Sequence, residues 1–244
     1  MRNVLVSGGS RGLGLAIAST LAAGNYRVIA FARRETAELR AAMDLVDRDG
    51  RGGLLFRALD LTEFSSIGPF VLALRKEFGA IYGLVNNAGI GTAGLLTMMR
   101  ESEMERIVRV NALAPMILTK YVLRSMMTER SGRIINVASI VASSGYSGLS
   151  VYSATKAALI GFTRSLAREV GRLDITVNAI APGFIDTDMT QELTEEERAK
   201  IERRSALGRM VTAPDVAAAA EYLMSDKARN VTGMTFTIDA GNTA

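Results

Sequence analysis

The sequence predicts an α/β fold with one doubly wound, mostly parallel sheet of about seven strands and helices on both faces. Short apolar segments alternate with longer segments of helical periodicity along the whole chain, and such alternation is typical of parallel sheets. Almost half of the 244 residues are hydrophobic, and aromatic content is low. This composition is typical of buried strands covered by helices.

The first unit of this alternation lies at the start of the chain. NVLVS at residues 3–7 is a short apolar strand, and the run GGSRGLG ends it. LAIASTLAAG then has helical spacing and ends at Gly24, and YRVIAFA at 26–32 is a second strand. Strand, turn, helix and strand in this order predict a βαβ unit.

The same alternation continues to the end of the chain. The further predicted strands cover residues 54–60, 81–89, 132–139, 174–183 and 234–239. The further predicted helices cover residues 35–49, 63–79, about 101–130, 151–171 and 213–225. We expect helix 101–130 to be broken near Asn111.

The domain organisation is predicted to be simple. No linker rich in Pro, Gly or Ser divides the sequence, so we expect one dinucleotide-binding and catalytic domain over residues 1–244. Residues 183–212 are charged and the least regular part of the chain. We expect a substrate loop or lid there, with a plain surface excursion as the alternative.

Two residue types that carry much enzyme chemistry are absent, since the chain contains neither Cys nor His. Disulfides, thiolate nucleophiles, Ser-His-Asp hydrolysis and imidazole acid–base chemistry are therefore excluded, and we expect no metal site. Acid–base chemistry near neutral pH then depends on Tyr, Lys, Asp or Glu. A tyrosine acid needs a nearby cation to lower its pKa from about 10.

The charge pattern indicates a solvated surface. The net charge is +4, and acidic and basic residues are interspersed, as in TEEERAKIERR. No basic tail or aromatic-basic platform predicts nucleic-acid binding. No apolar run reaches the roughly 18 residues of a membrane span, and MRN leads directly into the first strand without a signal peptide. We therefore expect a cytoplasmic protein without nucleic-acid or membrane partners.

A glycine-rich turn follows the first strand and opens the first helix. In Rossmann-like folds this context lets the backbone approach a pyrophosphate, which the free N–H groups of the helix then bind. We expect contacts to a dinucleotide from Gly8, Ser10, Arg11, Gly12, Leu13 and Gly14.

The cofactor is predicted to be NADP(H). In this architecture an acid at the end of the second strand selects NAD, and here the strand ends at Arg33 and Arg34 instead. Two guanidinium groups suit a 2′-phosphate. Further residues at carboxyl ends of strands are expected around the adenosine, namely Asp60, Leu61, Asn87, Ala88 and Gly89.

A candidate reaction centre lies near the fifth strand. Ser139 closes that strand, and Tyr152 and Lys156 share one face of the following helix. Such a cluster suits reduction of a carbonyl: the serine donates a hydrogen bond to the oxygen and the tyrosine delivers the proton. The lysine ammonium is expected to lower the phenol pKa and to hold the nicotinamide ribose.

With these motifs in order, the chain resembles the short-chain dehydrogenase/reductase family over essentially its whole length. The matching segments are SGGSRGLG, NNAG at 86–89, Asn111, Ser139, YSATK at 152–156 and APG at 181–183. The resemblance implies a catalytic set of Asn111, Ser139, Tyr152 and Lys156, with Asn111 kinking its helix to hold a water. It also implies nicotinamide contacts from Pro182, Gly183, Ile185 and Thr187.

Within the family, the local sequence is most similar to that of the 3-oxoacyl-(acyl-carrier-protein) reductases. The resemblance implies NADPH-dependent reduction of the 3-keto group of carrier-bound acyl chains. It also implies an acidic carrier protein, which we expect to dock near Arg130 and Arg133. Residues GRLD, ending at Asp174, depart from the usual pattern and leave a specialised pathway open.

Assembly and alternative functions follow from the same resemblance. The helices near 111–130 and 151–170 carry more than one apolar face, and the family implies a homo-oligomer built as a dimer of dimers. One alternative function is an NADP(H)-dependent dehydrogenase of another alcohol or ketone, such as a sugar, a steroid or a secondary-pathway ketone. Another is a non-catalytic nucleotide sensor.

Overall fold

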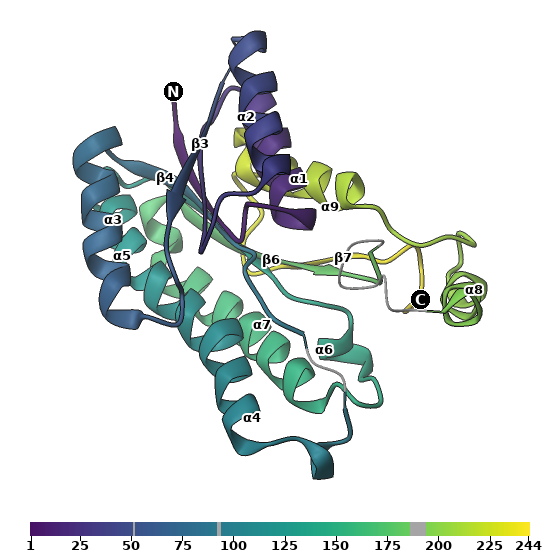
Figure 1. Ribbon diagram of the computed structural model, residues 1–244. Helices are drawn as coiled ribbons and strands as arrows, with labels where there is room; N and C mark the ends of the chain where they lie inside the picture. Colours follow the sequence, from purple (N-terminus) through teal and green to yellow (C-terminus); the bar gives the residue numbers. More distant parts are fainter. Residues whose placement is uncertain (51, 92–93, 186–193) are drawn as a thin grey trace.

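The computed structural model describes the whole chain except residues 51, 92–93 and 186–193. One seven-stranded sheet runs through it in the order β3-β2-β1-β4-β5-β6-β7 (Figure 1). All neighbouring strands are parallel. The strands are β1 (Asn3–Ser7), β2 (Arg27–Ala32), β3 (Gly53–Ala58), β4 (Ile81–Asn86), β5 (Gly132–Val137), β6 (Ile175–Pro182) and β7 (Thr235–Ile238). The predicted fold class and strand number are confirmed.

Helices cover both faces of the sheet, as Figure 1 shows. On one face lie α1 (Gly12–Ala23), α2 (Ala37–Asp49) and α9 (Ala213–Met224). On the other face lie α3 (Phe64–Phe78), α5 (Ala114–Glu129) and α7 (Ser150–Val170). The remaining helices are α4 (Glu101–Val108), α6 (Val141–Ser144) and α8 (Glu195–Arg204) among the described residues. No helix of that described part is long and apolar enough to cross a membrane.

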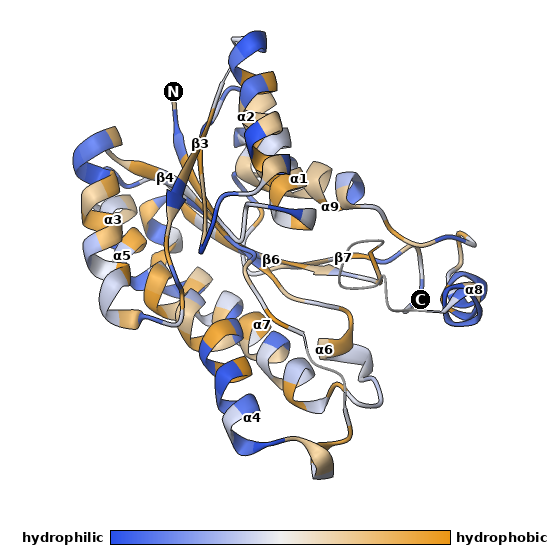
Figure 2. Cartoon of the chain, in the orientation of Figure 1, coloured by the Kyte–Doolittle hydropathy of each residue, from blue (hydrophilic) through white to orange (hydrophobic). Residues whose placement is uncertain are grey.

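The core consists of two apolar layers, one on each side of the sheet (Figure 2). In β1, Val4 and Val6 belong to the layer under α1 and α9, whereas Leu5 between them belongs to the layer under α5. Successive strand residues point to opposite faces. Because both faces are covered, the three central residues of the strand are all apolar. This burial is why the strands could be located from their composition.

The predicted break near Asn111 is confirmed. The helical segment from α4 to α5 is interrupted by a π-helical turn, η2 (Arg109–Leu113). Asn111 is completely buried in that turn. Its side-chain amide makes two hydrogen bonds with the backbone of Ile90. Nδ2 donates to the carbonyl at 2.8 Å, and Oδ1 accepts from the N–H at 2.8 Å. A π-bulge of this kind changes the direction of the side chains beside it.

The described part of the predicted irregular region 183–212 contains a regular helix. Helix α8 begins after Thr194, whose hydroxyl accepts the Glu197 N–H at 3.2 Å. The Glu197 carboxylate accepts the Thr194 N–H at 2.8 Å in return. This reciprocal arrangement is a capping box, and the sequence TEEE is its signature. That signal was sufficient to predict the helix.

The predicted docking role is wrong for Arg133, which is buried, whereas docking near the exposed Arg130 stays a prediction. Arg133 is only 2% exposed, and its guanidinium donates to the carbonyls of Gly132 and Asp174 at 2.8 and 3.1 Å. Both arginines lie at the amino end of β5, whereas Ser139 follows its carboxyl end. A strand of this length separates the two ends by roughly 20 Å.

Arg133 is expected to stabilise the fold and Arg130 is not. Arg133→Met removes two buried charge-assisted hydrogen bonds, so the free energy of unfolding should fall by about 1–3 kcal/mol. Arg130→Met, the matched control, changes an exposed side chain and should stay within about 0.5 kcal/mol. Urea unfolding of both variants measures the difference. Equal stabilities would contradict the structural assignment of Arg133.

Candidate active site

The predicted site residues gather at the carboxyl edge of the sheet. The strand order reverses between β1 and β4, which pair with each other although two strands, β2 and β3, separate them in sequence order. In doubly wound sheets, a reversal of this kind opens a crevice outside the strand ends. The turn after β1 and the NNAG segment after β4 both end at this crevice.

The turn between β1 and α1 is shaped by its glycines. Gly8 and Gly12 have φ angles of 64° and 53°, in the left-handed region that disfavours side chains. A Cβ on Gly14 would lie 2.1 Å from the Gly8 carbonyl oxygen, so that position admits only glycine. By contrast, a Cβ on Gly12 would meet nothing within 4 Å. The turn is therefore packed on its inner side and open on its outer side.

The open side of the turn suits a phosphate. Helix α1 starts at Gly12, and no side chain caps its N-terminus. Its first N–H groups and the positive end of its dipole face the turn. Arg11, in extended conformation with φ of −158°, precedes the helix, and Leu13 begins its first turn. Contact of these residues with the pyrophosphate of a dinucleotide stays a prediction.

Ser7 joins this turn to the NNAG segment. Its hydroxyl accepts the N–H groups of Asn87 and Ala88 at 2.9 and 3.0 Å and donates to the Val85 carbonyl at 3.3 Å. The Asn87 amide donates to the Ser7 carbonyl at 2.9 Å. Ser7 was not among the predicted site residues, because its partners lie about 80 residues away in the sequence. A small hydroxyl residue at a strand end before a glycine turn was the available signal.

The end of the crevice beside β2, where the adenosine is predicted to bind, is basic. Arg33 and Arg34 are exposed and directly follow β2. The nearest acid along the chain, Glu35, pairs with Arg40 at 2.7 Å. Thr36, another residue not predicted, donates to the Ser10 carbonyl at 2.5 Å and accepts the Leu39 N–H at the start of α2. It thereby links the glycine turn to the segment that carries the two arginines.

Asp60 lies after β3, on the other side of these arginines. One carboxylate oxygen accepts the N–H and the hydroxyl of Thr62 at 2.9 and 2.8 Å. These hydrogen bonds, together with the nearby Arg33 charge, lower the pKa of Asp60. Leu61 is half-buried beside it. The carboxylate therefore stays ionised and orders the loop that borders the crevice.

The candidate catalytic side chains meet where β5 and α7 approach each other. Ser139 follows β5, and Tyr152 lies in the first turn of α7. The Ser139 side chain donates a hydrogen bond to the Tyr152 phenol. Lys156 lies one turn further along and is only 4% exposed. Its Nζ donates to the Val137 carbonyl at 2.8 Å and lies 5.6 Å from the centre of the Tyr152 ring.

The NNAG segment, Lys156 and Asn111 are also close together. A Cβ on Gly89 would lie 3.4 Å from both Lys156 Nζ and Asn111 Oδ1. Asn111 Nδ2 additionally lies 3.4 Å from the Thr155 hydroxyl on α7. The structure thus brings Asn111, Ser139, Tyr152 and Lys156 into one cluster, beside the loop that Ser7 holds.

Burial controls both titrating groups of this cluster. It lowers the pKa of Lys156 to about 8. It raises the pKa of Tyr152, and the hydrogen bond with Ser139 opposes that rise. The expected lowering of the phenol pKa by the ammonium is therefore wrong for this structure. Lys156 directs its Nζ to the Val137 carbonyl, and desolvation of the phenol outweighs other effects.

The predicted nicotinamide contacts follow β6. The Gly183 N–H donates to the Ile238 carbonyl at 2.8 Å, and a Cβ on Gly183 would lie 2.9 Å from Asp239 Cα. Pro182 ends β6, and Ile185 forms a parallel bridge with Val211. Thr187 lies outside the described residues. The described three extend the crevice from β1 and β4 towards β7.

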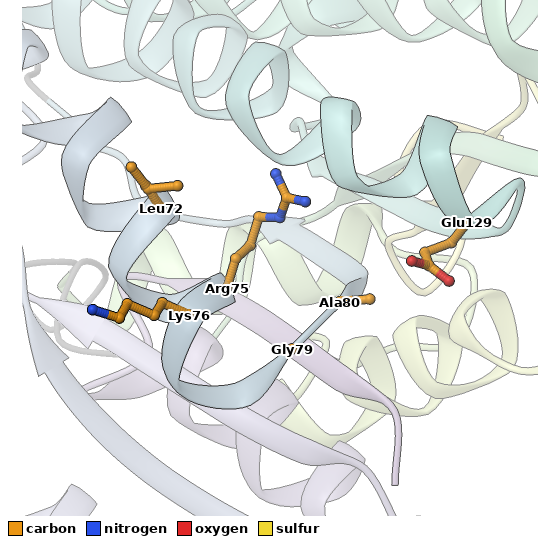
Figure 3. A pocket seen from close by; sticks show the side chains of 6 residues that line it. All are labelled: Leu72, Arg75, Lys76, Gly79, Ala80 and Glu129. Atoms are coloured by element: carbon orange, nitrogen blue, oxygen red, sulfur yellow. The ribbon is translucent and has the colours of Figure 1, made fainter.

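Two hollows differ in their relation to this cluster. A cavity of about 160 Å³ lies beside Ser139, between α6 and α8. A hollow of about 520 Å³ lies at the ends of α3 and α5 (Figure 3) and is lined by Leu72, Arg75, Lys76, Gly79, Ala80 and Glu129. The larger hollow lies near the amino end of β4, and the residues that line it include none of the predicted site residues. The smaller cavity is the one relevant to the candidate active site.

Comparison with known proteins agrees with this geometry. Residues 2–198 match the family of short chain dehydrogenases. The chain is 43% identical over 237 residues to the 3-oxoacyl-[acyl-carrier-protein] reductase FabG of Escherichia coli, covering 97% of this chain and 95% of that protein. The FabG proteins of Vibrio cholerae and Pseudomonas aeruginosa are 42% and 41% identical, with the same coverage.

A solved structure has the same fold. It is a putative gluconate dehydrogenase from Agrobacterium tumefaciens, with a TM-score of 0.94 and 25% sequence identity, covering 100% of this chain and 96% of that one. Sequence and fold therefore lead to the same family. The chain belongs to the short-chain dehydrogenases and is an oxidoreductase of that family.

Proposed function

We propose that this oxidoreductase is an NADPH-dependent ketoreductase that reduces the 3-keto group of acyl thioesters to the 3-hydroxy product. The observation that carries the proposal is the cluster of Ser139, Tyr152 and Lys156 beside the glycine turn. The similarity to 3-oxoacyl-[acyl-carrier-protein] reductases supports the choice of substrate.

The cluster supplies the groups that carbonyl reduction requires. A nicotinamide bound along the crevice supplies the hydride. Negative charge then develops on the carbonyl oxygen, where the Ser139 hydroxyl donates a hydrogen bond and Tyr152 donates its proton. The raised pKa of Tyr152 keeps the phenol protonated at neutral pH, so it is ready to act as an acid in the direction of reduction.

Lys156 and Asn111 support the tyrosine. With a pKa of about 8, Lys156 is mostly an ammonium at neutral pH. This ammonium can hold the nicotinamide ribose. Asn111, held in the π-turn, is proposed to position a water that returns a proton through Lys156. The turn fixes Asn111 without help from a bound ligand, because its amide is already paired with Ile90.

NADPH is the proposed cofactor because of the basic end of the crevice. Arg33 and Arg34 follow β2 where a NAD enzyme places an acid. Guanidinium groups bind phosphate in a bidentate manner and tolerate exposure to water. Since Glu35 is paired with Arg40, it does not oppose a 2′-phosphate at this position.

Oxidation of a small hydroxy compound is the second candidate. The fold matches that of a putative gluconate dehydrogenase along the whole chain. The same cluster would then catalyse the reverse reaction, with Tyr152 accepting the proton of the alcohol.

A non-catalytic nucleotide sensor is the weakest alternative, because the chain has all four residues of the proposed catalytic set, Ser, Tyr, Lys and Asn.

Assembly into a homo-oligomer, a dimer of dimers, is also proposed. Leu118, Val122 and Met126 of α5 are fully buried within the chain and belong to its core. Exposed apolar side chains remain elsewhere on the segment from α4 to α5, at Val108, Leu113 and Met127. Such side chains are suited to contact with another copy.

Tyr152→Phe tests the proposed reaction. Loss of the proton donor should reduce kcat by about 10²–10⁴-fold, while NADPH binding, followed by its fluorescence, stays intact. Tyr222→Phe alters an exposed tyrosine of α9 and is the matched control. The assay is NADPH oxidation with an acetoacetyl thioester. Near-normal turnover of Tyr152→Phe would refute the tyrosine's role.

Lys156→Met is expected to stabilise the protein while abolishing reduction. Between pH 8 and 10.5 the unfolded chain holds the lysine proton that the folded chain has lost, so wild-type stability rises with pH. Below pH 8 the folded protein carries a buried charge, and removing it should raise the free energy of unfolding by about 1–3 kcal/mol. This advantage should shrink as the pH rises through the stated window.

Urea unfolding at pH 7 and pH 10 measures that difference, with Lys227→Met, an exposed lysine, as the control. A Lys156→Met variant that is less stable than wild type at pH 7, or whose difference from wild type does not depend on pH, would show that burial does not dominate at Lys156.

Arg33→Ala combined with Arg34→Ala tests cofactor choice. The ratio of the Kd values for NADPH and NADH should rise by about 10–100-fold, because a charged contact to phosphate is lost. Arg48→Ala, an exposed arginine in the last turn of α2, is the control. Calorimetric titration measures both cofactors. Parallel weakening of both would argue against recognition of the 2′-phosphate.

A further inference from the structure

The smaller cavity has one wall formed by the segment that directly follows Ser139 and another formed by α8. Ile140 and Val141, directly after Ser139, line it from one side. Phe184, directly after Gly183, lines it from the nicotinamide side. Lys200, Ile201 and Arg204 line it from α8. A substrate group in this cavity would therefore be continuous with a carbonyl at Ser139 and Tyr152.

The inner walls of the cavity are apolar and ordered. Tyr146 and Phe184 meet edge to face, with ring centres 5.5 Å apart, and Ile201 is buried on the opposite side. The volume of about 160 Å³ is well below the roughly 300–1,000 Å³ of a site for a whole drug-sized ligand. The cavity is thus sized for one short portion of a substrate.

The charges at the cavity are unbalanced. Lys200 and Arg204 lie four residues apart on α8, so they share one face of the helix. Neither forms an ion pair with a residue in the described part of the chain. Among the described lining residues the one acid is Glu197, which lies near Lys200 and whose carboxylate accepts hydrogen bonds from the N–H and hydroxyl of Thr194 at 2.8 and 3.1 Å. The two cations therefore remain available to a ligand.

The position of the two cations is fixed by the C-terminal segment. Asn242 is 8% exposed and lines the cavity, and its amide donates to the Ile201 carbonyl and the Ser205 hydroxyl at 3.3 and 3.2 Å. The Leu207 N–H donates to the Ala240 carbonyl at 3.0 Å. Helix α8 is thus held by its carboxyl-terminal half, next to Arg204.

The geometry points to an anion subsite in which Lys200 and Arg204 bind a carboxylate or phosphate group of the substrate while its carbonyl lies at Ser139 and Tyr152. This inference rests on the proposed function and adds a substrate class to it. An Arg and a Lys one turn apart can contact both oxygens of such a group, and the apolar walls accept the carbon atoms that precede it. A neutral substrate would leave the two cations without a partner.

Two sources supply this chemistry in an acyl thioester. One is a carboxylate at the far end of a short acyl chain, and the other is the phosphate of a phosphopantetheine arm. The neutral reference is acetoacetyl-N-acetylcysteamine. The monothioester of 3-oxoadipate with N-acetylcysteamine adds the carboxylate, and acetoacetyl-phosphopantetheine, compared with acetoacetyl-pantetheine, adds the phosphate.

The test compares kcat/KM for these compounds in wild type, Lys200→Gln/Arg204→Gln and the control Arg203→Gln. Arg203 is an exposed arginine on the same helix that does not line the cavity. We expect wild type to prefer one anionic compound over its neutral counterpart. That ratio should fall about tenfold in the double variant, mainly through KM, and persist in Arg203→Gln. The compound whose advantage is lost identifies the source.

An unchanged ratio in the double variant, or an equal loss in Arg203→Gln, would overturn the inference, because the effect would then be absent or due to general charge. Calorimetric binding of glutarate and of phosphopantetheine to the NADPH-loaded protein gives a readout independent of turnover. Binding about tenfold weaker in the double variant supports the subsite, and equal or absent binding to wild type and variant opposes it. Failure to reduce any thioester, including the neutral one, would instead contradict the proposed function.

Discussion

The hydroxyl of Ser7 holds the candidate site together. It makes three hydrogen bonds at the point where the strand order reverses, and all of them join the end of β1 to the end of β4. The glycine turn and the NNAG segment are therefore set relative to each other before any ligand arrives. Gly89 then lies next to Lys156 and Asn111, so the phosphate end and the reacting end share one framework. Preorganisation of this kind reduces the cost of ordering a bound ligand.

The reacting end carries groups that are unfavourable for the fold. A lysine is buried with a lowered pKa, and a helix is interrupted by a π-turn. Buried polar groups are tolerated where partners are supplied, as for Asn136, which accepts from Asn86 and donates to the Thr163 hydroxyl, both at 2.8 Å. Strained or costly features of this kind are typical of sites where chemistry occurs. The core on both faces of the sheet provides the compensating stability.

Much of the fold could be predicted from the sequence, and the reason is local. Strands buried on both faces are apolar throughout, and helices between them have periodicity, so each of the seven strands was located within a few residues. The break at Asn111 was predicted as well. Long-range partners had no local signal: Ser7 contacts Asn87, and Arg133 contacts Asp174. Arg133 is buried at the amino end of β5. Its contacts there could not be read from the neighbouring residues in the sequence.

Electrostatics was the other limit. Tyr and Lys four residues apart predicted an acidified phenol, yet the direction of a buried group's pKa depends on desolvation and on where the Nζ hydrogen bond goes. The capping box of α8 was readable in TEEE but was outweighed by the charge of the segment. Because α8 is tied to the chain's C-terminal segment, substitutions on it can alter which compound is accepted without disturbing the sheet or the hydride-transfer centre. An architecture of this kind can diversify its range of compounds over evolution while its chemistry stays the same.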